Sequence, residues 1–155
     1  MTMAMNITTQ AATSADREDL LRLLGTQLYE HDVFLKPDQL AHAIDGMLAD
    51  PRRGRILVAH EGTKMVGVAV LAYTWTLEHG GQASWLDELY VEPTYRSRGI
   101  GTQLLHAAMS RAKEDGCVAM DLEVEASHAR AQALYLREGF TAHTRSRFVR
   151  VLDDR

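Results

Sequence analysis

Apolar residues recur at helical spacing in four stretches of the chain, and this pattern predicts four amphipathic helices. The predicted helices cover residues 15–30, 37–50, 100–114 and 129–138. Thr13-Ser14 can act as an N-cap for the first, and Pro37 suits the first position of the second. Gly116 and Gly139 follow the last two, where a glycine commonly ends a helix.

Short runs rich in Val, Ile and Leu predict β-strands between these helices. The stronger runs cover residues 55–60, 64–73, 83–91 and 118–124, and weaker ones cover 5–11, 140–143 and 147–152. Residues 61–63 read as a tight hairpin connection, and residues 76–82, with Gly80-Gly81, read as a loop.

The resulting element order is β-α-α-β-β-β-α-β-α-β-β. Strands that alternate with helices in this way predict an α/β fold with a mixed central sheet and helices on both faces. The chain has no internal repeat, linker or low-complexity segment. We therefore expect a single domain over residues 1–155.

The composition is that of an ordinary globular protein, with 46% hydrophobic and 25% charged residues. A net charge of −4 and the lack of a long Lys/Arg run argue against nucleic acid as a partner. The longest apolar run, residues 66–73, is too short to span a membrane. Residues 1–8 have neither a basic start nor an apolar segment, so we expect no secretory signal and a cytoplasmic location.

Cysteine and histidine patterns give little support to thiol or metal chemistry. Cys117 is the only cysteine, so an internal disulfide is excluded. It follows Gly116 in a predicted turn, with no Cys-His-Asp order, and we do not expect it to be a nucleophile. The seven His residues form no H-E-x-x-H pattern, and we expect no metal site.

A basic turn with two glycines connects the third strong strand to the third helix. It reads Arg96-Ser97-Arg98-Gly99-Ile100-Gly101-Thr102. The first turn of a helix has backbone N–H groups without partners and the positive end of the helix dipole, which together favour phosphate. Gly99 and Gly101 lack a Cβ, so a diphosphate can approach the backbone. The third glycine of a G-x-G-x-x-G fingerprint and the lysine of a P-loop are both missing.

The pattern Arg96-x-x-Gly99-x-Gly101 resembles the R/Q-x-x-G-x-G/A pyrophosphate loop of the GNAT family of N-acetyltransferases. Residues 122–140 resemble the second signature of that family, a strand followed by N-x-x-A-x-x-L-Y and then G-F. The agreeing positions are Ala131, Leu134, Tyr135, Gly139 and Phe140. The resemblance implies the acetyltransferase fold, acetyl-CoA as cosubstrate, and direct transfer of an acetyl group to a primary amine.

The resemblance also implies roles for particular residues. Tyr135 matches the general acid, and a phenol of pKa ~10 can protonate a thiolate whose reference pKa is ~8.5. The backbone of Leu89, Tyr90 and Val91 matches the strand that pairs with the pantetheine chain, and residues 96–102 match the diphosphate site. His128 replaces the family's Asn, and it can contact the cofactor or cap the helix.

Asp87 and Glu88 are the two candidates for the base that takes the ammonium proton. Adjacent residues of a regular strand face opposite sides of the sheet, so we expect only one of them to face the reaction. Asp87 stands four residues before Val91, where polyamine-type members of the family carry an acid. Glu88 stands where other members place one. The polyamine-type motif favours Asp87 narrowly.

The resemblance places the acceptor against loops that carry acidic and aromatic residues in this chain. The substrate candidates are Tyr29, Glu30, Trp75 and Trp85. Acidic and aromatic groups suit a small cationic amine, and the motifs look closest to the small-amine and polyamine-type members. Two alternatives stay open: a protein N-terminal acetyltransferase of the ribosomal-protein type, and a noncatalytic acyl-CoA-binding module. A homodimer is usual in the family, and no membrane partner is expected.

Overall fold

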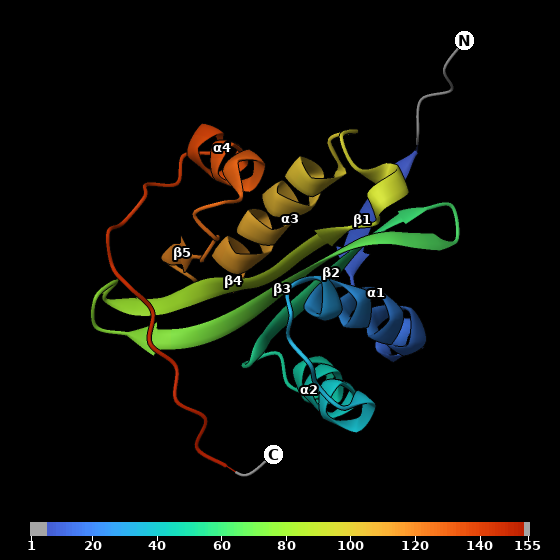
Figure 1. The fold of residues 1–155 in the computed structure, drawn as a ribbon, viewed down its shortest axis with the longest axis horizontal. Helices are drawn as coiled ribbons and strands as arrows, with labels where there is room; N and C mark the ends of the chain where they lie inside the picture. The colour runs from blue at the N-terminus through green and yellow to red at the C-terminus, as the bar shows by residue number, and fades with distance from the viewer. Residues whose placement is uncertain (1–5, 154–155) are drawn as a thin grey trace. The chain divides into compact units, whose positions relative to one another are not determined.

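The computed structural model describes residues 6–153, which form two compact units. The first unit ends at Glu123 and the second begins at Val124. The first contains the sheet and three of the helices, and the second contains one helix and the C-terminal segment (Figure 1).

The first unit is built on a five-stranded sheet in the order β1-β2-β3-β4-β5. Its strands are β1 (Ile7–Ala11), β2 (Gly54–Glu61), β3 (Lys64–Thr76), β4 (Gly81–Val91) and β5 (Ala119–Asp121). The first four pair antiparallel, and β5 joins β4 in parallel. The prediction of a mixed sheet is therefore confirmed. Met5, with which the first predicted strand began, lies outside the described residues.

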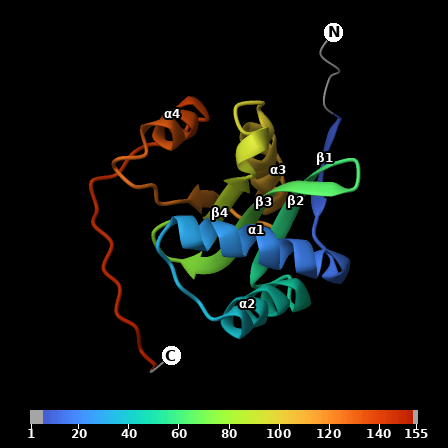
Figure 2. The same cartoon turned by 45° about the vertical axis from the view of Figure 1, so that its right-hand side comes forward.

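Helices cover both faces of this sheet, as predicted. The helices α1 (Arg17–Glu30) and α2 (Pro37–Ala49) lie on one face, and α3 (Ile100–Glu114) lies on the other (Figures 1 and 2). The core beneath α1 and α2 includes Leu20, Ile44 and Val68, all buried. On the other face α3 approaches β3 closely, because a Cβ on Gly67 would lie 2.8 Å from Leu104 Cδ1. Gly67 therefore lets the buried side of α3 reach the sheet.

The helix ends follow local chemistry. Thr13 and Asp16 form a reciprocal cap, in which the Thr13 N–H donates to Asp16 Oδ2 at 2.8 Å and Thr13 Oγ1 accepts from the Ala15 N–H at 3.3 Å. This cap encloses a 3₁₀ turn, Ser14–Asp16, so α1 begins two residues later than predicted. Pro37 is the first residue of α2, and α3 has the predicted bounds.

The hairpin between β2 and β3 turns on Gly62 and Thr63, with Glu61 opposite Lys64. Gly62 has φ +61°, which a residue without a Cβ adopts at little cost. At the other end of β3 the predicted loop over 76–82 is too long. β4 begins at Gly81, because Gly81 and Gln82 pair with Thr76 and Trp75.

The second unit contains α4 (Ala129–Arg137), which ends before Gly139 with φ +91°. The predicted strands at 140–143 and 147–152 are wrong, because the structure assigns no strand to residues 140–152. A strand needs a hydrogen-bonding partner and a face to bury. Here Phe148 and Leu152 are both exposed, and basic residues interrupt the apolar ones.

The predicted strand at 118–124 is also too long, since β5 spans only Ala119–Asp121. Its partners are Ala83, Ser84 and Trp85 at the start of β4. Beyond that point the two segments no longer pair, so residues 122–124 have no ladder to join.

Candidate active site

A β-bulge interrupts β4 at the two adjacent acidic residues. Val70 of β3 pairs with Glu88, whereas the next residue, Leu71, pairs with Leu86. Asp87 is therefore an extra residue of β4, and no residue of β3 lies opposite it in the register. The bulge breaks the alternation of the strand, and the prediction that Asp87 and Glu88 face opposite sides is wrong: both line the same cavity.

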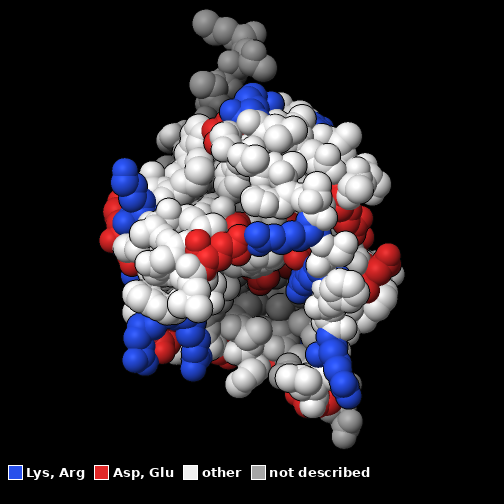
Figure 3. All heavy atoms as spheres, turned by 90° about the vertical axis from the view of Figure 1, so that its left-hand side faces the viewer, with Lys and Arg blue, Asp and Glu red and all other residues white. Residues whose placement is uncertain are grey.

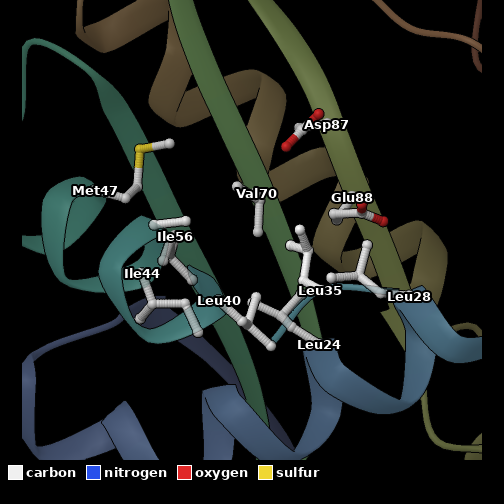
Figure 4. A pocket seen from close by; sticks show the side chains of 11 residues that line it. Leu24, Leu28, Leu35, Leu40, Ile44, Met47, Ile56, Val70, Asp87 and Glu88 are labelled. Atoms are coloured by element: carbon white, nitrogen blue, oxygen red, sulfur yellow. The ribbon is translucent and has the colours of Figure 1, made fainter. Parts of the chain in front are cut away.

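The cavity has a volume of about 170 Å³ and lies between the sheet and the helices α1 and α2. Asp87 and Glu88 form its wall on β4, and apolar side chains from α1, α2, β2 and β3 face them (Figure 4). The apolar lining consists of Leu24, Leu28, Leu35, Leu40, Ala43, Ile44, Met47, Ile56 and Val70. The two carboxyl groups are the only charged groups of this lining.

Burial raises the pKa of Glu88 to about 7, and the neighbouring Asp87 carboxylate adds to the rise. The Glu88 side chain is half-buried, whereas Asp87 is exposed. A carboxyl group with a pKa near neutrality can exchange a proton with substrate at physiological pH. Glu88 therefore has the electrostatic properties of a general base.

The strand beyond the bulge has an open edge. β4 pairs with β5 only over Ala83–Trp85, so residues 86–91 have no strand partner on that side within the described chain. Backbone groups along this edge can hydrogen-bond an extended ligand as another strand would. The Tyr90 side chain instead points into the core, and burial followed by the Glu30 charge raises its pKa.

The turn after β4 leads directly into the N-terminus of α3. Gly99 is the N-cap with φ +80°, and it offers no side-chain cap to the first turn. Ser97 also adopts a left-handed conformation, with φ +67°. Consecutive N–H groups in such a turn make an anion-binding concavity, and the helix dipole adds to it. The loop over residues 96–102 therefore fits a diphosphate through its backbone.

The side chain of Arg96 is held by the protein itself. Its Nε–H donates to the Val91 carbonyl at 2.8 Å, its Nη2 lies 3.4 Å from Glu30 Oε2, and its guanidinium lies over the Tyr90 ring at 5.3 Å. Arg98 lies over the ring of Tyr95, 5.6 Å from the centroid. The Arg96 side chain thus links the end of β4 to α1.

The second unit carries the remaining two candidates. Tyr135 lies on α4 and contacts the Phe140 ring edge to face, with 5.6 Å between centroids. His128 is the N-cap of α4, but its side chain makes no capping hydrogen bond. Its backbone carbonyl accepts from the Gln132 N–H at 3.1 Å, and the Gln132 side chain donates to the carbonyls of Glu125 and Ala126 at 3.1 Å each.

The predicted substrate residues do not gather around the cavity. Tyr29 is 71% exposed and contacts Phe34 edge to face, and Trp75 is 79% exposed. Trp85 lies opposite Ala72 in the sheet, and Glu30 pairs with Arg96. None of the four belongs to the cavity lining.

Sequence reasoning missed the apolar lining. Leu24, Leu28, Ile44 and Met47 lie on helix faces that point toward the sheet, and their spacing is the same for a filled core and for a cavity wall. One available signal was the apolar run Val33-Phe34-Leu35, because it stands between two helices where no helical pattern requires apolar residues. Of the three, Leu35 belongs to the lining.

A polar cluster lies at the C-terminal end of α3, formed by Asp115 and its partners. Arg55 Nε donates to Asp115 Oδ2 at 2.7 Å, Tyr73 donates to the same oxygen at 2.7 Å, and Arg111 donates to Oδ1. These hydrogen bonds, led by that of Arg55, hold the pKa of Asp115 well below its usual range. The cluster ties α3 to β2 and β3.

Charge is mixed on one face of the molecule. On the face drawn in Figure 3, basic and acidic side chains stand among one another. No helix of the described residues is long and apolar enough to cross a membrane. Within residues 6–153, no group of three or more His, Cys, Asp or Glu side chains is placed to hold a metal ion.

Comparison with known proteins finds a match to the acetyltransferase (GNAT) family model over residues 17–140. The uncharacterized N-acetyltransferase YhfO of Bacillus subtilis is 30% identical over 89 residues, which are 57% of this chain and 60% of that protein. Aminoglycoside N(6')-acetyltransferase type 1 of Klebsiella aerogenes is 29% identical over 105 residues, covering 66% and 68%. The chain thus spans about two thirds or less of these relatives.

Solved structures share the architecture. An integron cassette protein from the mobile metagenome of Cole Harbour Salt Marsh superposes with a TM-score of 0.83 at 27% identity, covering 94% of this chain and 91% of that one. Aminoglycoside N-acetyltransferase AAC(6')-Iy in complex with CoA superposes with a TM-score of 0.81 at 18% identity, covering 94% and 95%. At 18% identity the latter likeness concerns the fold alone.

Proposed function

Since the chain belongs to the acetyltransferase (GNAT) family, we propose that it transfers the acetyl group of acetyl-CoA directly to a primary amine. The observation that carries this proposal is the half-buried Glu88 carboxyl, whose pKa is raised to about 7 in an apolar cavity. It lies on the strand that leads to the glycine turn of α3. A base and an anion-binding turn are two of the parts that amine acetylation requires.

In the proposed reaction Glu88 takes a proton from the ammonium group of the acceptor. The freed nitrogen forms a bond to the acetyl carbonyl carbon, the carbon–sulfur bond breaks, and the leaving thiolate takes a proton from Tyr135. The nitrogen, positively charged after it attacks, gives up its second proton through solvent to the Tyr135 phenolate, which restores the phenol. Acetyl-CoA supplies the activated acyl group and the thiol leaving group. Open-edge N–H groups of β4 hydrogen-bond the thioester oxygen and the pantetheine amides, and the backbone of residues 96–102 holds the diphosphate.

Glu88 replaces Asp87 as the favoured base in this proposal. The bulge gives both residues access to the cavity, so orientation no longer separates them. The pKa of Glu88 is raised toward neutrality by burial, and a base near the working pH is the more effective one. Asp87 contributes negative charge that attracts the ammonium group. The acceptor is accordingly a small cationic amine.

The names of several relatives support an amine acceptor. One relative is an aminoglycoside acetyltransferase, another an aminoalkylphosphonate N-acetyltransferase of Salmonella typhimurium, and a third a thialysine N-epsilon-acetyltransferase of Sus scrofa. Each acts, by its name, on an amino group, and the rest of the substrate molecule differs from one relative to the next. These names support nitrogen as the acceptor atom. Because the rest of the acceptor differs among them, its size and polarity are inferred from the cavity.

Thiol release from acetyl-CoA against a panel of acceptors tests the proposal. We expect release above the acceptor-free background with at least one small primary amine. Release only with peptides that carry a free N-terminus would favour the N-terminal acetyltransferase alternative. Coenzyme A binding by calorimetry without release from any acceptor would favour the noncatalytic module.

A further inference from the structure

The cavity lining is apolar except for two carboxylic acids. Nine of its eleven residues are aliphatic or methionine, and the other two are the carboxylic acids Asp87 and Glu88. The lining contains no serine, threonine, asparagine, glutamine, lysine or arginine. A ligand with several hydroxyl or amino groups would leave them without partners, and each such group costs free energy when it leaves water. A ligand suited to this cavity is therefore apolar except at one end.

The volume sets the size of the apolar part. An engineered cavity of about 150 Å³ with an aliphatic and aromatic lining holds one benzene molecule. The cavity here, at about 170 Å³, is close to that size. It therefore has room for an apolar body of roughly six to eight carbon atoms.

The charge sets the polar end. Asp87 and Glu88 come from consecutive positions of one strand and lie on the same wall of the cavity (Figure 4). A single ammonium group placed between them can interact with both carboxyl groups. If the body of the ligand fills the aliphatic part of the cavity, a second cationic group on that body would lose its hydration without gaining a partner.

We propose that the acceptor is a primary monoamine whose ammonium group meets Asp87 and Glu88 and whose uncharged body, about the size of a six-carbon ring or chain, fills the cavity between α1, α2 and the sheet. This inference rests on the proposed function and narrows it. Among small cationic amines it favours those with one charge and an apolar body over polyamines and over the polyhydroxylated aminoglycosides.

A series of linear amines tests the size and polarity together. We expect kcat/KM for acetyl transfer to rise about fourfold for each added methylene from ethylamine to hexylamine, because each CH₂ leaves water for an apolar wall. The rise should stop once the cavity is full, near six to eight carbons. Hexylamine and benzylamine should exceed spermidine and kanamycin at least tenfold.

Leu35 offers a variant that alters the lining without opening the core, because it lies in the segment between α1 and α2 and is 42% exposed. Leu35→Asn should lower the ratio of kcat/KM for hexylamine to that for ethylamine about tenfold. The matched control is Phe34→Asn, at a neighbouring residue that is 72% exposed and outside the lining. The control should preserve the whole amine series.

The outcomes separate this inference from the proposed function. Thiol release with spermidine or kanamycin as fast as with hexylamine would overturn the apolar monoamine and leave the acetyltransferase standing. A flat amine series, or equal effects of Leu35→Asn on ethylamine and hexylamine, would overturn it as well. If no amine supports thiol release, the proposed function fails. Calorimetric titration of hexylamine and spermidine into the protein with coenzyme A then decides the cavity's preference by binding alone.

Discussion

Asp87 and Glu88 are consecutive residues of β4 that line one cavity, because the bulge between Leu86 and Glu88 leaves Asp87 without an opposite residue on β3. Two carboxyl groups this close disfavour each other's ionisation. In the proposed reaction the pair supplies both the negative charge that binds the ammonium group and the carboxylate that accepts its proton. Kinetics of amide variants can separate ammonium binding by one residue from proton acceptance by the other.

Replacing each acid by its amide separates the two roles. Glu88→Gln should lower kcat by about 10²–10⁴-fold, as expected for loss of a positioned base. In the unmodified protein kcat/KM should rise with pH through about pH 7, where Glu88 loses its proton. Asp87→Asn should mainly raise KM and should move this inflection to lower pH, because the neighbouring negative charge is gone. Full kcat in Glu88→Gln with loss in Asp87→Asn would reverse the assignment.

The raised pKa of Glu88 also predicts how stability depends on pH. Its pKa is about 7 in the folded protein against an ordinary 4.5, so between these values the folded state binds more protons than the unfolded state. The free energy of unfolding should therefore fall as pH rises from about 4.5 to 7. After a discount for its partial exposure, we expect the effect to be about 1–2 kcal/mol. Urea denaturation of Glu88→Gln should show a flatter pH profile, and an unchanged profile would contradict the shift.

Removal of the Tyr135 hydroxyl should affect chemistry more than binding. Tyr135→Phe retains the ring that contacts Phe140, so α4 should keep its local packing. We expect coenzyme A affinity to stay within twofold in calorimetry and kcat to fall about 10²–10⁴-fold in thiol release. An unchanged kcat would make Tyr135 a packing residue and would leave solvent as the proton donor.

Gly101 allows the phosphate site to be tested without damage to the helix. A Cβ at this position would lie 3.9 Å from Val91 Cγ2, an ordinary contact, so Gly101→Ala fits the fold. The change should stabilise α3 by about 0.5–1 kcal/mol through helix propensity while weakening coenzyme A binding, because a methyl group now stands against the diphosphate. Gly101→Glu should weaken binding further by bulk and charge.

The control for Gly101 is Gly25→Ala in α1, where the added Cβ would lie 3.7 Å from Leu40 Cδ2. It should give a similar gain in stability with no change in coenzyme A affinity. Equal affinity of both alanine variants and of Gly101→Glu for coenzyme A would reject the loop as the diphosphate site.

Asp115 should be important for stability. Asp115→Asn removes a charge that accepts from Arg55, Tyr73 and Arg111, and we expect a loss of about 3 kcal/mol in urea denaturation at pH 7. Because the folded pKa of Asp115 is lowered, its contribution is complete above about pH 4 and is lost as pH falls further. The gap between the two proteins should narrow below pH 4. Equal stability at pH 7 would show that the cluster does not stabilise the fold.

The sequence predicted the elements better than their details. Helical spacing located α3 to the residue, and the Gly62 hairpin and the N-cap at Thr13 followed from turn and capping preferences. The bulge at Asp87 could not be predicted, because alternation continues on both sides of it and only the pairing with β3 reveals the extra residue. The cavity could not be predicted either, because apolar helix faces with this spacing are the same whether the space beneath them is filled or empty.

In the C-terminal region the sequence predicted strands that the structure does not contain. Residues 147–152 have apolar residues in a short run, and on composition alone they predict a strand. A strand forms only where a second segment pairs with it, because its backbone N–H and C=O groups need hydrogen-bonding partners on a neighbouring strand. Without such a partner the apolar content of the run did not suffice.

The extra residue in β4 makes the site depend on chain length as well as on residue type. Pairing with β5 ends at Trp85, two positions before the bulge, and a bulge bends and twists its strand. One inserted position thus adds a carboxylate to the cavity and coincides with the opening of the sheet edge. A substitution at Asp87 keeps the inserted position, whereas deletion of the residue is expected to return β4 to regular pairing. Relatives that differ here by an insertion or deletion would therefore differ in acceptor and cofactor geometry together, whatever side chains they carry.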